Sequence, residues 1–160
     1  MTIWIDNDGC PRIVRDMVFK AAQRVQWPVQ VVGNSWMRIL DDPLFKMIVV
    51  SGGFDAVDDH IAAKVGANDL VITADVPLAS RIVSKDAVAL SPRGDVFDSK
   101  SISERLAMRN LMQELRSAGE IKRGHGTFNE SDKKKFADAF DRLLNQLVRS
   151  RGERIKITDE

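Results

Sequence analysis

The sequence has little of what secreted and membrane proteins depend on. A single cysteine, Cys10, occurs in the 160 residues, so no intramolecular disulfide framework can form. No apolar run approaches the roughly 20 residues that a membrane-spanning helix needs. The N-terminus leads directly into a strand pattern that carries Asp6 and Asp8, instead of the charged and apolar regions of a signal peptide. These absences predict a cytoplasmic protein with no membrane partner.

An excess of charge of either sign is also missing. Lysine and arginine together number 24, aspartate and glutamate 23, and the net charge is +1. No global field therefore favours nucleic acid or a membrane surface, and any electrostatic binding must depend on a local patch. The length and the 44% hydrophobic content fit one domain with a substantial core.

What the sequence does contain is an alternation of strand and helix patterns. Short apolar runs predict strands at 2–5, 28–32, 46–51, 69–74 and 86–90. Amphipathic or capped segments predict helices at 11–26, 55–65, 77–84, about 101–117 and 131–150. Residues 36–45 are expected to be irregular or to form one short helix. The alternation predicts an α/β fold: a doubly wound parallel sheet of about five strands in a three-layer sandwich. Residues 1–150 then form a single domain with additional C-terminal helices, and 151–160 a charged, flexible tail.

Two aspartates mark the end of the first predicted strand. Asp6 and Asp8 follow the apolar run, and Pro11 can open a helix at its first turn. Ligands of open α/β sheets bind beyond the carboxyl ends of the strands. Carboxylate oxygens at that position suit a hard divalent cation. The competing interpretation is that Asp6 and Asp8 only cap the turn and the following helix.

Further aspartates fall at the ends of later strands. Asp55, Asp58 and Asp59 open the helix after the third strand, and Asp75 ends the fourth. Parallel strands would bring these acids to one edge of the sheet, where they repel one another unless cations bind. Aspartate at a helix start is also favoured by capping and by the helix dipole, and this is the expected role of Asp55. Asp58 and Asp75 are the stronger candidates for a site.

Several motifs together resemble one known family. They are Asp6-Asn7-Asp8-Gly9-Cys10-Pro11, the segment 53–61, Thr73-Ala74-Asp75-Val76-Pro77-Leu78-Ala79 and Pro92-Arg93-Gly94. They resemble the YaiI/YqxD family of uncharacterised bacterial proteins, over nearly the whole chain to about Ser150. The chain departs from the family pattern at Asn7 and Gly9, where alanine is expected, and in the loop 124–127, where a Gly-Gly-Pro pattern is expected.

That family is similar in turn to the PIN-like nuclease fold. Asp6, Asp58 (with Ile61 after it) and Asp75 (with Thr73 before it) match the acid positions of PIN domains, whereas Asp8 belongs to the narrower family. The resemblance implies a PIN-like domain at 1–150. It also implies Mg²⁺- or Mn²⁺-dependent hydrolysis of phosphodiester bonds, with RNA as the favoured substrate and DNA as the other.

The resemblance implies a metal-assisted mechanism in which carboxylates hold one or two cations that activate a water. Asp6 and Asp75 are the predicted metal ligands. Asp58 is predicted to be a ligand or to orient the attacking water, and Asp8 to be a ligand or the partner of one. All four are therefore candidate catalytic residues. Thr73 is expected to support a neighbouring carboxylate through its hydroxyl.

A nuclease also needs contacts to its substrate. The candidates are Asn34 after the second strand, Thr73, Arg93 after the fifth strand and Arg109. Further positive charge is available from Arg105, Arg116, Lys122 and Arg123, although solvated helix faces explain such charges equally. Trp36 could stack on a base or be buried in the fold.

Three other functions compete at this point. Asp6-x-Asp8-Gly9 superficially matches the nucleophile motif of haloacid-dehalogenase-like phosphatases, whose chemistry also needs a later lysine and further acids. Cys10 at a helix N-terminus could be a nucleophile, with His60 or His125 as base. A non-catalytic module that binds nucleic acid or metal on the same fold is the third.

Overall fold

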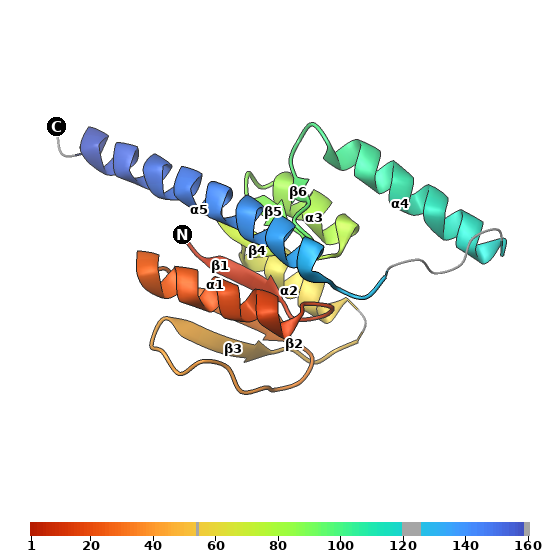
Figure 1. The fold of residues 1–160 in the computed structure, drawn as a ribbon, viewed down its shortest axis with the longest axis horizontal. Coiled ribbons are helices and arrows are strands. Elements are labelled where there is room, and N and C mark those ends of the chain that lie inside the picture. The colour runs from red at the N-terminus through yellow and green to blue at the C-terminus, as the bar shows by residue number, and fades with distance from the viewer. Residues whose placement is uncertain (54, 120–125, 159–160) are drawn as a thin grey trace.

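The computed structural model describes residues 1–53, 55–119 and 126–158, with a six-stranded sheet between layers of helices (Figure 1). The strands are β1 Ile3–Asp6, β2 Val29–Gly33, β3 Phe45–Val49, β4 Leu70–Ile72, β5 Val88–Leu90 and β6 Val96–Phe97. The helices are α1 Arg12–Val25, α2 Ala56–Lys64, α3 Val76–Val83, α4 Ile102–Ser117 and α5 Glu130–Thr158.

The strand order in the sheet is β3-β2-β1-β4-β5-β6. All neighbouring pairs are parallel except β5 and β6. The chain builds outward from β1 to β3, then returns to the other side of β1 with β4. The direction of winding therefore reverses between β1 and β4, and in open α/β sheets this is where a crevice opens beyond the carboxyl ends of the strands.

Alternation along the buried strands supplies both faces of the sheet. In β1, Ile3 and Ile5 belong to one apolar cluster and Trp4 to the other, as the two-residue period of a strand requires. The first cluster is closed by α1 and α5, which add Val14, Val18, Phe136, Phe140 and Leu144. The second is closed by α2 and α3, which add Val57, Ile61, Leu78 and Ile82. The predicted three-layer α/β fold is confirmed.

Helix α4 is attached differently. Ile102 is its single buried residue, and its main partner is α3. The ribbon shows it projecting from the body of the molecule (Figure 1). Met108, Leu111 and Met112 are 53%, 48% and 38% exposed. This helix therefore forms an arm with an apolar surface of its own.

The structure adds one strand to the sequence prediction, selects one of its alternatives and moves the end of the last helix. The antiparallel strand β6 was not predicted, because two residues leave no periodic signal. Residues 36–45 contain no helix, which selects the irregular alternative. Helix α5 continues to Thr158, so the end predicted at Ser150 is wrong. Flexibility of the tail stays a prediction. Among the described helices, none combines the length and apolarity needed to cross a membrane.

Candidate functional site

The first acid of the site is the last residue of β1. Asp6 is only 3% exposed. Its Oδ2 accepts a hydrogen bond from the Thr73 hydroxyl at 2.8 Å, and its Oδ1 accepts one from the Asp8 amide at 3.1 Å. The turn after β1 thus folds back on the Asp6 side chain and places Asp8 beside it.

Thr73 connects the ends of β1 and β4. Its hydroxyl donates to Asp6, while its Oγ1 accepts a hydrogen bond from the Asp75 amide at 3.0 Å. It is only 1% exposed. The hydrogen bond to Asp6 is the carboxylate support expected of Thr73, whereas a direct substrate contact by Thr73 stays a prediction.

Asp75 and Asp58 come from the first turns of two helices. Asp75 is the N-cap of α3, and its Oδ1 accepts from the Leu78 amide at 2.9 Å. Asp58 lies in the first turn of α2, and its side chain is hydrogen-bonded to that of Asp75. Asp55 is the N-cap of α2, as predicted, although its side chain makes no capping bond. Asp75 therefore both caps helix α3 and belongs to the candidate site.

These elements enclose a cleft of about 510 Å³ beyond the ends of β1 and β4. Its walls include all four predicted acids and Asn34: Asp6, Asp8, Asn34, Asp58 and Asp75. Val50, Ser51, Gly52, Gly53 and Val57 complete it. We call this the acid cleft. The predicted convergence of acids from three separate segments is present at the point where the winding reverses.

The crowding of acids raises two pKa values. Burial raises the pKa of Asp58 to about 7, with help from the charges of Asp75 and Asp6 and from the hydrogen bond with Asp75. Burial also raises the pKa of Asp6 to about 6, reinforced by the charges of Asp8 and Asp75, although the bonds from Thr73 and Asp8 oppose the shift. Two carboxyl groups can be hydrogen-bonded only if one of them carries a proton. Protons thus offset part of the negative charge in the acid cleft.

The donor atoms of the acid cleft suit a hard cation. Carboxylate and amide oxygens are the ligands that Mg²⁺ and Mn²⁺ prefer. Within the described parts of the chain, however, no three His, Cys, Asp or Glu side chains are arranged to hold a metal ion. Oxygens of Asp6 and Asp75 instead accept hydrogen bonds from Thr73 and from backbone amides. With a pKa of about 7, the Asp58 carboxyl group would have to lose its proton before it could bind a cation.

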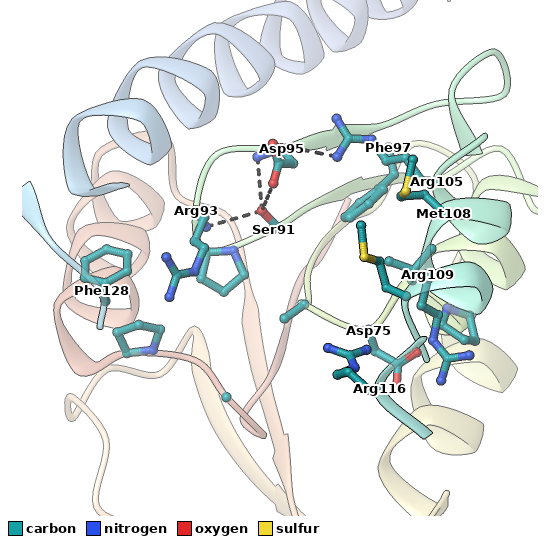
Figure 2. Close-up of a pocket in the computed structure, with 17 residues that line it drawn as sticks. Asp75, Ser91, Arg93, Asp95, Phe97, Arg105, Met108, Arg109, Arg116 and Phe128 are labelled. Carbon is teal, nitrogen blue, oxygen red and sulfur yellow. Dashed lines mark hydrogen bonds and ion pairs between the residues drawn. The ribbon is translucent and has the colours of Figure 1, made fainter. Parts of the chain in front are cut away.

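A second and larger cleft adjoins the first. It measures about 910 Å³ and shares Asp75 with the acid cleft (Figure 2). The predicted substrate contacts Arg93 and Arg109 line it, together with Arg105 and Arg116. We call this the arginine cleft. The structure thus places the predicted basic residues beside the acids, but in a cleft of their own.

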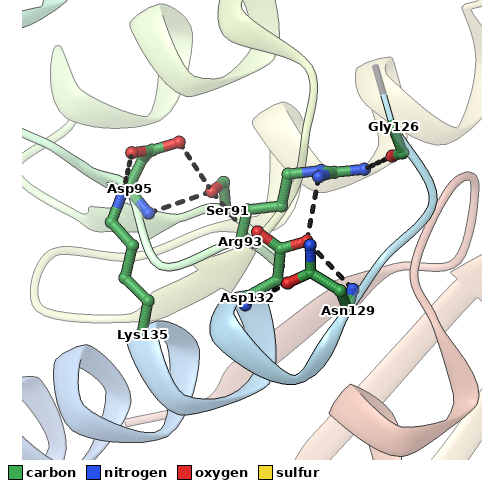
Figure 3. A network of polar contacts seen from close by, with 7 residues as sticks. All are labelled: Ser91, Arg93, Asp95, Gly126, Asn129, Asp132 and Lys135. Carbon is green, nitrogen blue, oxygen red and sulfur yellow. Dashed lines mark hydrogen bonds and ion pairs between the residues drawn. The ribbon is translucent and has the colours of Figure 1, made fainter.

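Arg93 also has a structural role that its position after β5 did not reveal. Its Nη1 lies 3.0 Å from Asp132 Oδ2, and its other terminal nitrogen donates to the Gly126 carbonyl (Figure 3). Beside it, Lys135 Nζ lies 2.9 Å from Asp95 Oδ1. A side-chain carbon on Gly94, whose φ is +91°, would lie 2.7 Å from the Lys135 backbone. The turn after β5 and the start of α5 are therefore locked together.

The remaining sequence expectations have varied outcomes. Trp36 is 71% exposed, so the expectation that it is buried is wrong. Lys122, Arg123 and His125 lie outside the described residues, as does part of the loop 124–127.

Burial raises the pKa of the Cys10 thiol to about 12, which removes the basis for a nucleophilic thiolate. No lysine lines either cleft among the described residues, so the phosphatase interpretation lacks the lysine that its chemistry needs.

Sequence reasoning missed the residues that hold the turn between β1 and α1. Arg15 Nη1 donates to Asn7 Oδ1 at 3.1 Å and to the Cys10 carbonyl at 2.7 Å. Asn7 Nδ2 lies 3.1 Å from the Met37 sulfur. The one available signal was the departure from the family pattern at Asn7. These contacts fix the backbone that carries Asp6 and Asp8.

Comparison with known proteins gives one consistent family. The sequence model described as "Uncharacterized BCR, YaiI/YqxD family" matches residues 4–146. A UPF0178 protein from Geobacter sulfurreducens is 48% identical over 150 residues, covering 93% of this chain and 99% of the relative. UPF0178 proteins from Trichlorobacter lovleyi and Bordetella petrii are each 46% identical, over 93% and 90% of this chain and 97% and 96% of their own lengths. No solved structure matches the chain.

Proposed function

The chain belongs to the YaiI/YqxD family of uncharacterised bacterial proteins, and we propose that it is a divalent-metal-dependent nuclease that hydrolyses phosphodiester bonds, with RNA as the favoured substrate. The choice of RNA rests on the resemblance of the acid positions to PIN-like nucleases. The family itself assigns no activity, so the proposal depends on the acid cleft.

One observation carries the proposal. Asp6, Asp8, Asp58 and Asp75 come from three segments and line one cleft where ligands bind in open α/β sheets. A fold does not need to bring four acids together for its own stability, because the raised pKa values of Asp6 and Asp58 show that their ionisation opposes folding at neutral pH. Perturbed carboxyl groups in a cleft are typical of functional sites.

Each acid is suited to a different part in the reaction. Asp6, oriented by Thr73 and the Asp8 amide, and Asp75, fixed as a helix cap, are the residues that would hold Mg²⁺ or Mn²⁺. A bound cation supplies Lewis acidity and lowers the pKa of a coordinated water. Asp58, with a pKa of about 7, is poised to accept a proton near neutral pH. Asp8 adds negative charge at the cleft mouth.

The test is cleavage of labelled single-stranded RNA, and of DNA of the same sequence, in Mg²⁺, Mn²⁺ or EDTA. We expect RNA cleavage with either cation and none in EDTA. Asp58→Asn and Asp75→Asn should each reduce the rate at least 100-fold, since each removes an acid from the cleft. Asp138→Asn is the matched control, because Asp138 is exposed on α5 outside both clefts. It should cleave at the wild-type rate.

Two results would reject the proposal. Equal cleavage by wild type and Asp75→Asn would assign the activity to a contaminant. No cleavage by the wild type with any cation would leave the non-catalytic alternative, a metal- or nucleic-acid-binding module. The lack of a ready three-ligand arrangement among the described residues is the observation that favours that alternative. Titration calorimetry with Mn²⁺ on the same samples then shows whether the acid cleft binds metal at all.

A further inference from the structure

The arginine cleft brings together two chemistries that do not usually share a cavity. Arginine side chains enter it from both sides, from the turn after β5 and from α4 (Figure 2). Apolar side chains also line the cleft, namely those of Met108, Met112, Phe97 and Phe128. A cleft for a small anion needs only the charges, whereas a cleft for an apolar ligand gains nothing from four arginines. The ligand must present both kinds of surface.

Two of the arginines are held in place by contacts with acidic and aromatic side chains of the protein. Arg93 is paired with Asp132 at 3.0 Å. Arg105 lies 3.7 Å from Asp95, and its Cζ is 5.3 Å from the centre of the Phe97 ring. Both remain more than a third exposed. Such residues are oriented before a ligand arrives, which lowers the entropy lost on binding.

The other two arginines extend the charge along α4. Arg105, Arg109 and Arg116 are spaced so that they return to one side of the helix. From Arg105 to Arg116 the helix axis advances about 16 Å. Within the described residues, neither Arg109 nor Arg116 forms an ion pair. The row of charges is longer than one phosphate group, which indicates a chain of phosphates.

The methionines distinguish a single strand from a duplex. Met108 and Met112 lie on the same helix as the arginines and are 53% and 38% exposed. A duplex presents phosphates to such a surface but hides the faces of its bases, whereas a single strand offers both. The bases of a bound single strand would thereby cover apolar side chains of α4 that the rest of the protein leaves exposed.

We propose that the arginine cleft binds the single-stranded RNA segment on one side of the bond to be cleaved. Its phosphates lie along Arg105, Arg109 and Arg116, and its bases contact Met108 and Met112. Asp75 borders both clefts, so the strand passes from the arginine cleft into the acid cleft there. This inference rests on the proposed nuclease function, which places cleavage in the acid cleft. Binding of the strand in the arginine cleft itself requires no metal and no cleavage.

The test measures binding in EDTA, by fluorescence anisotropy of a labelled single-stranded RNA over a series of salt concentrations. Arg109→Ala/Arg116→Ala removes two phosphate contacts. It should lower the slope of log K against log salt by about 1.4, at roughly 0.7 per phosphate for single strands. The matched control is Arg142→Ala/Arg149→Ala, because these arginines are exposed on α5 and outside the arginine cleft. It should leave the slope unchanged. Thermal melts confirm that all variants are folded.

A second pair of variants tests the contact with bases. Met108→Ser/Met112→Ser should reduce the preference for single-stranded over duplex RNA of the same sequence while leaving the salt slope unchanged. Polyglutamate should compete poorly, because it offers negative charge without bases. The inference is overturned if both arginine pairs weaken binding equally, if the methionine variant keeps the full preference, or if polyglutamate competes as well as RNA. Absence of cleavage with intact binding would reject the nuclease proposal and keep this one.

Discussion

Replacing Asp6 by asparagine should change the stability of the metal-free protein in opposite directions at low and at neutral pH. The side chain is 3% exposed and is surrounded by Thr73, Asp8 and Asp75. Asparagine has nearly the same shape and no charge. The variant therefore separates the cost of a buried charge from the value of the hydrogen bonds.

The cost of the charge follows from the pKa of Asp6, which rises from 3.8 to about 6 in the folded protein. A raised carboxyl pKa means that the folded state holds the proton more tightly than the unfolded chain does. Its contribution is fully present below pH 4 and is lost as the pH rises to about 6. A shift of this size corresponds to about 3 kcal/mol, at 1.36 kcal/mol per pKa unit.

The hydrogen bonds act in the other direction. Asp6 accepts from both the Thr73 hydroxyl and the Asp8 amide, and asparagine has only one oxygen to offer. The lost bond costs about 1 kcal/mol at every pH. Asp6→Asn should thus be about 1 kcal/mol less stable than wild type below pH 4. It should be about 2 kcal/mol more stable above pH 7, which corresponds to a rise in melting temperature of about 4–8 °C.

The measurement is a set of thermal melts of wild type and Asp6→Asn in EDTA between pH 4 and pH 8. Asp138→Asn reports the effect of removing an exposed acid and should follow wild type throughout. The difference between Asp6→Asn and wild type must change sign within this range. A variant that is less stable than wild type at every pH would show that Asp6 is a structural hydrogen-bond acceptor whose ionisation costs nothing, and the charge argument would be refuted.

Three further predictions concern substitutions at Asp75, Gly94 and Arg15. In EDTA, Asp75→Asn should be at least as stable as wild type, because asparagine also caps a helix and relieves the repulsion between the carboxylates, whereas Asp75→Ala should lose about 1 kcal/mol of stability together with the hydrogen bond from the Leu78 amide. An equal loss of stability in both variants would show that the charge of Asp75 is itself structural. Gly94→Ala should lower the free energy of unfolding, measured in urea, by more than about 2 kcal/mol, because the φ of +91° is strained for alanine and its Cβ would lie 2.7 Å from the Lys135 backbone. A smaller loss of stability would mean that the turn can move away from α5. Arg15→Ala should cost about 1–2 kcal/mol and reduce the rise in melting temperature that Mn²⁺ causes, because the turn carrying the first two acids loses its support; an unchanged response to Mn²⁺ would show that the turn holds its shape alone.

The extent of sequence prediction here has a physical explanation. The alternation of strands and helices and the convergence of the acids follow from local periodicity together with the rule that parallel strands end at one edge. The partner of Arg93 could not be predicted, because Asp132 lies 39 positions away along the chain and pairs with it only after α5 has docked. The exposure of Trp36 was missed because composition favours buried tryptophan and says nothing about a particular loop.

The division of roles between the two clefts was equally hidden from the sequence. The sequence placed Arg109 and Asp75 in one site, because Asp75 ends a predicted strand and Arg109 lies on the helix that follows the fifth strand. Their actual arrangement depends on the angle at which α4 leaves the sheet, which no local pattern encodes. Thr73 shows the opposite case, since the support of a carboxylate by its hydroxyl was expected from the mechanism that the resemblance to PIN domains implies.

The packing of α5 against α1 has a consequence for how the chain acquires its structure during synthesis. One face of the sheet is covered partly by Phe136, Phe140 and Leu144, which are synthesised after all six strands of the sheet. Until they emerge, Ile3, Val29 and Leu70 have lost only part of their contact with water, although their strands are already complete. The nascent protein should therefore present an apolar surface to chaperones until α5 has been synthesised and has docked, and it should become protease-resistant only then.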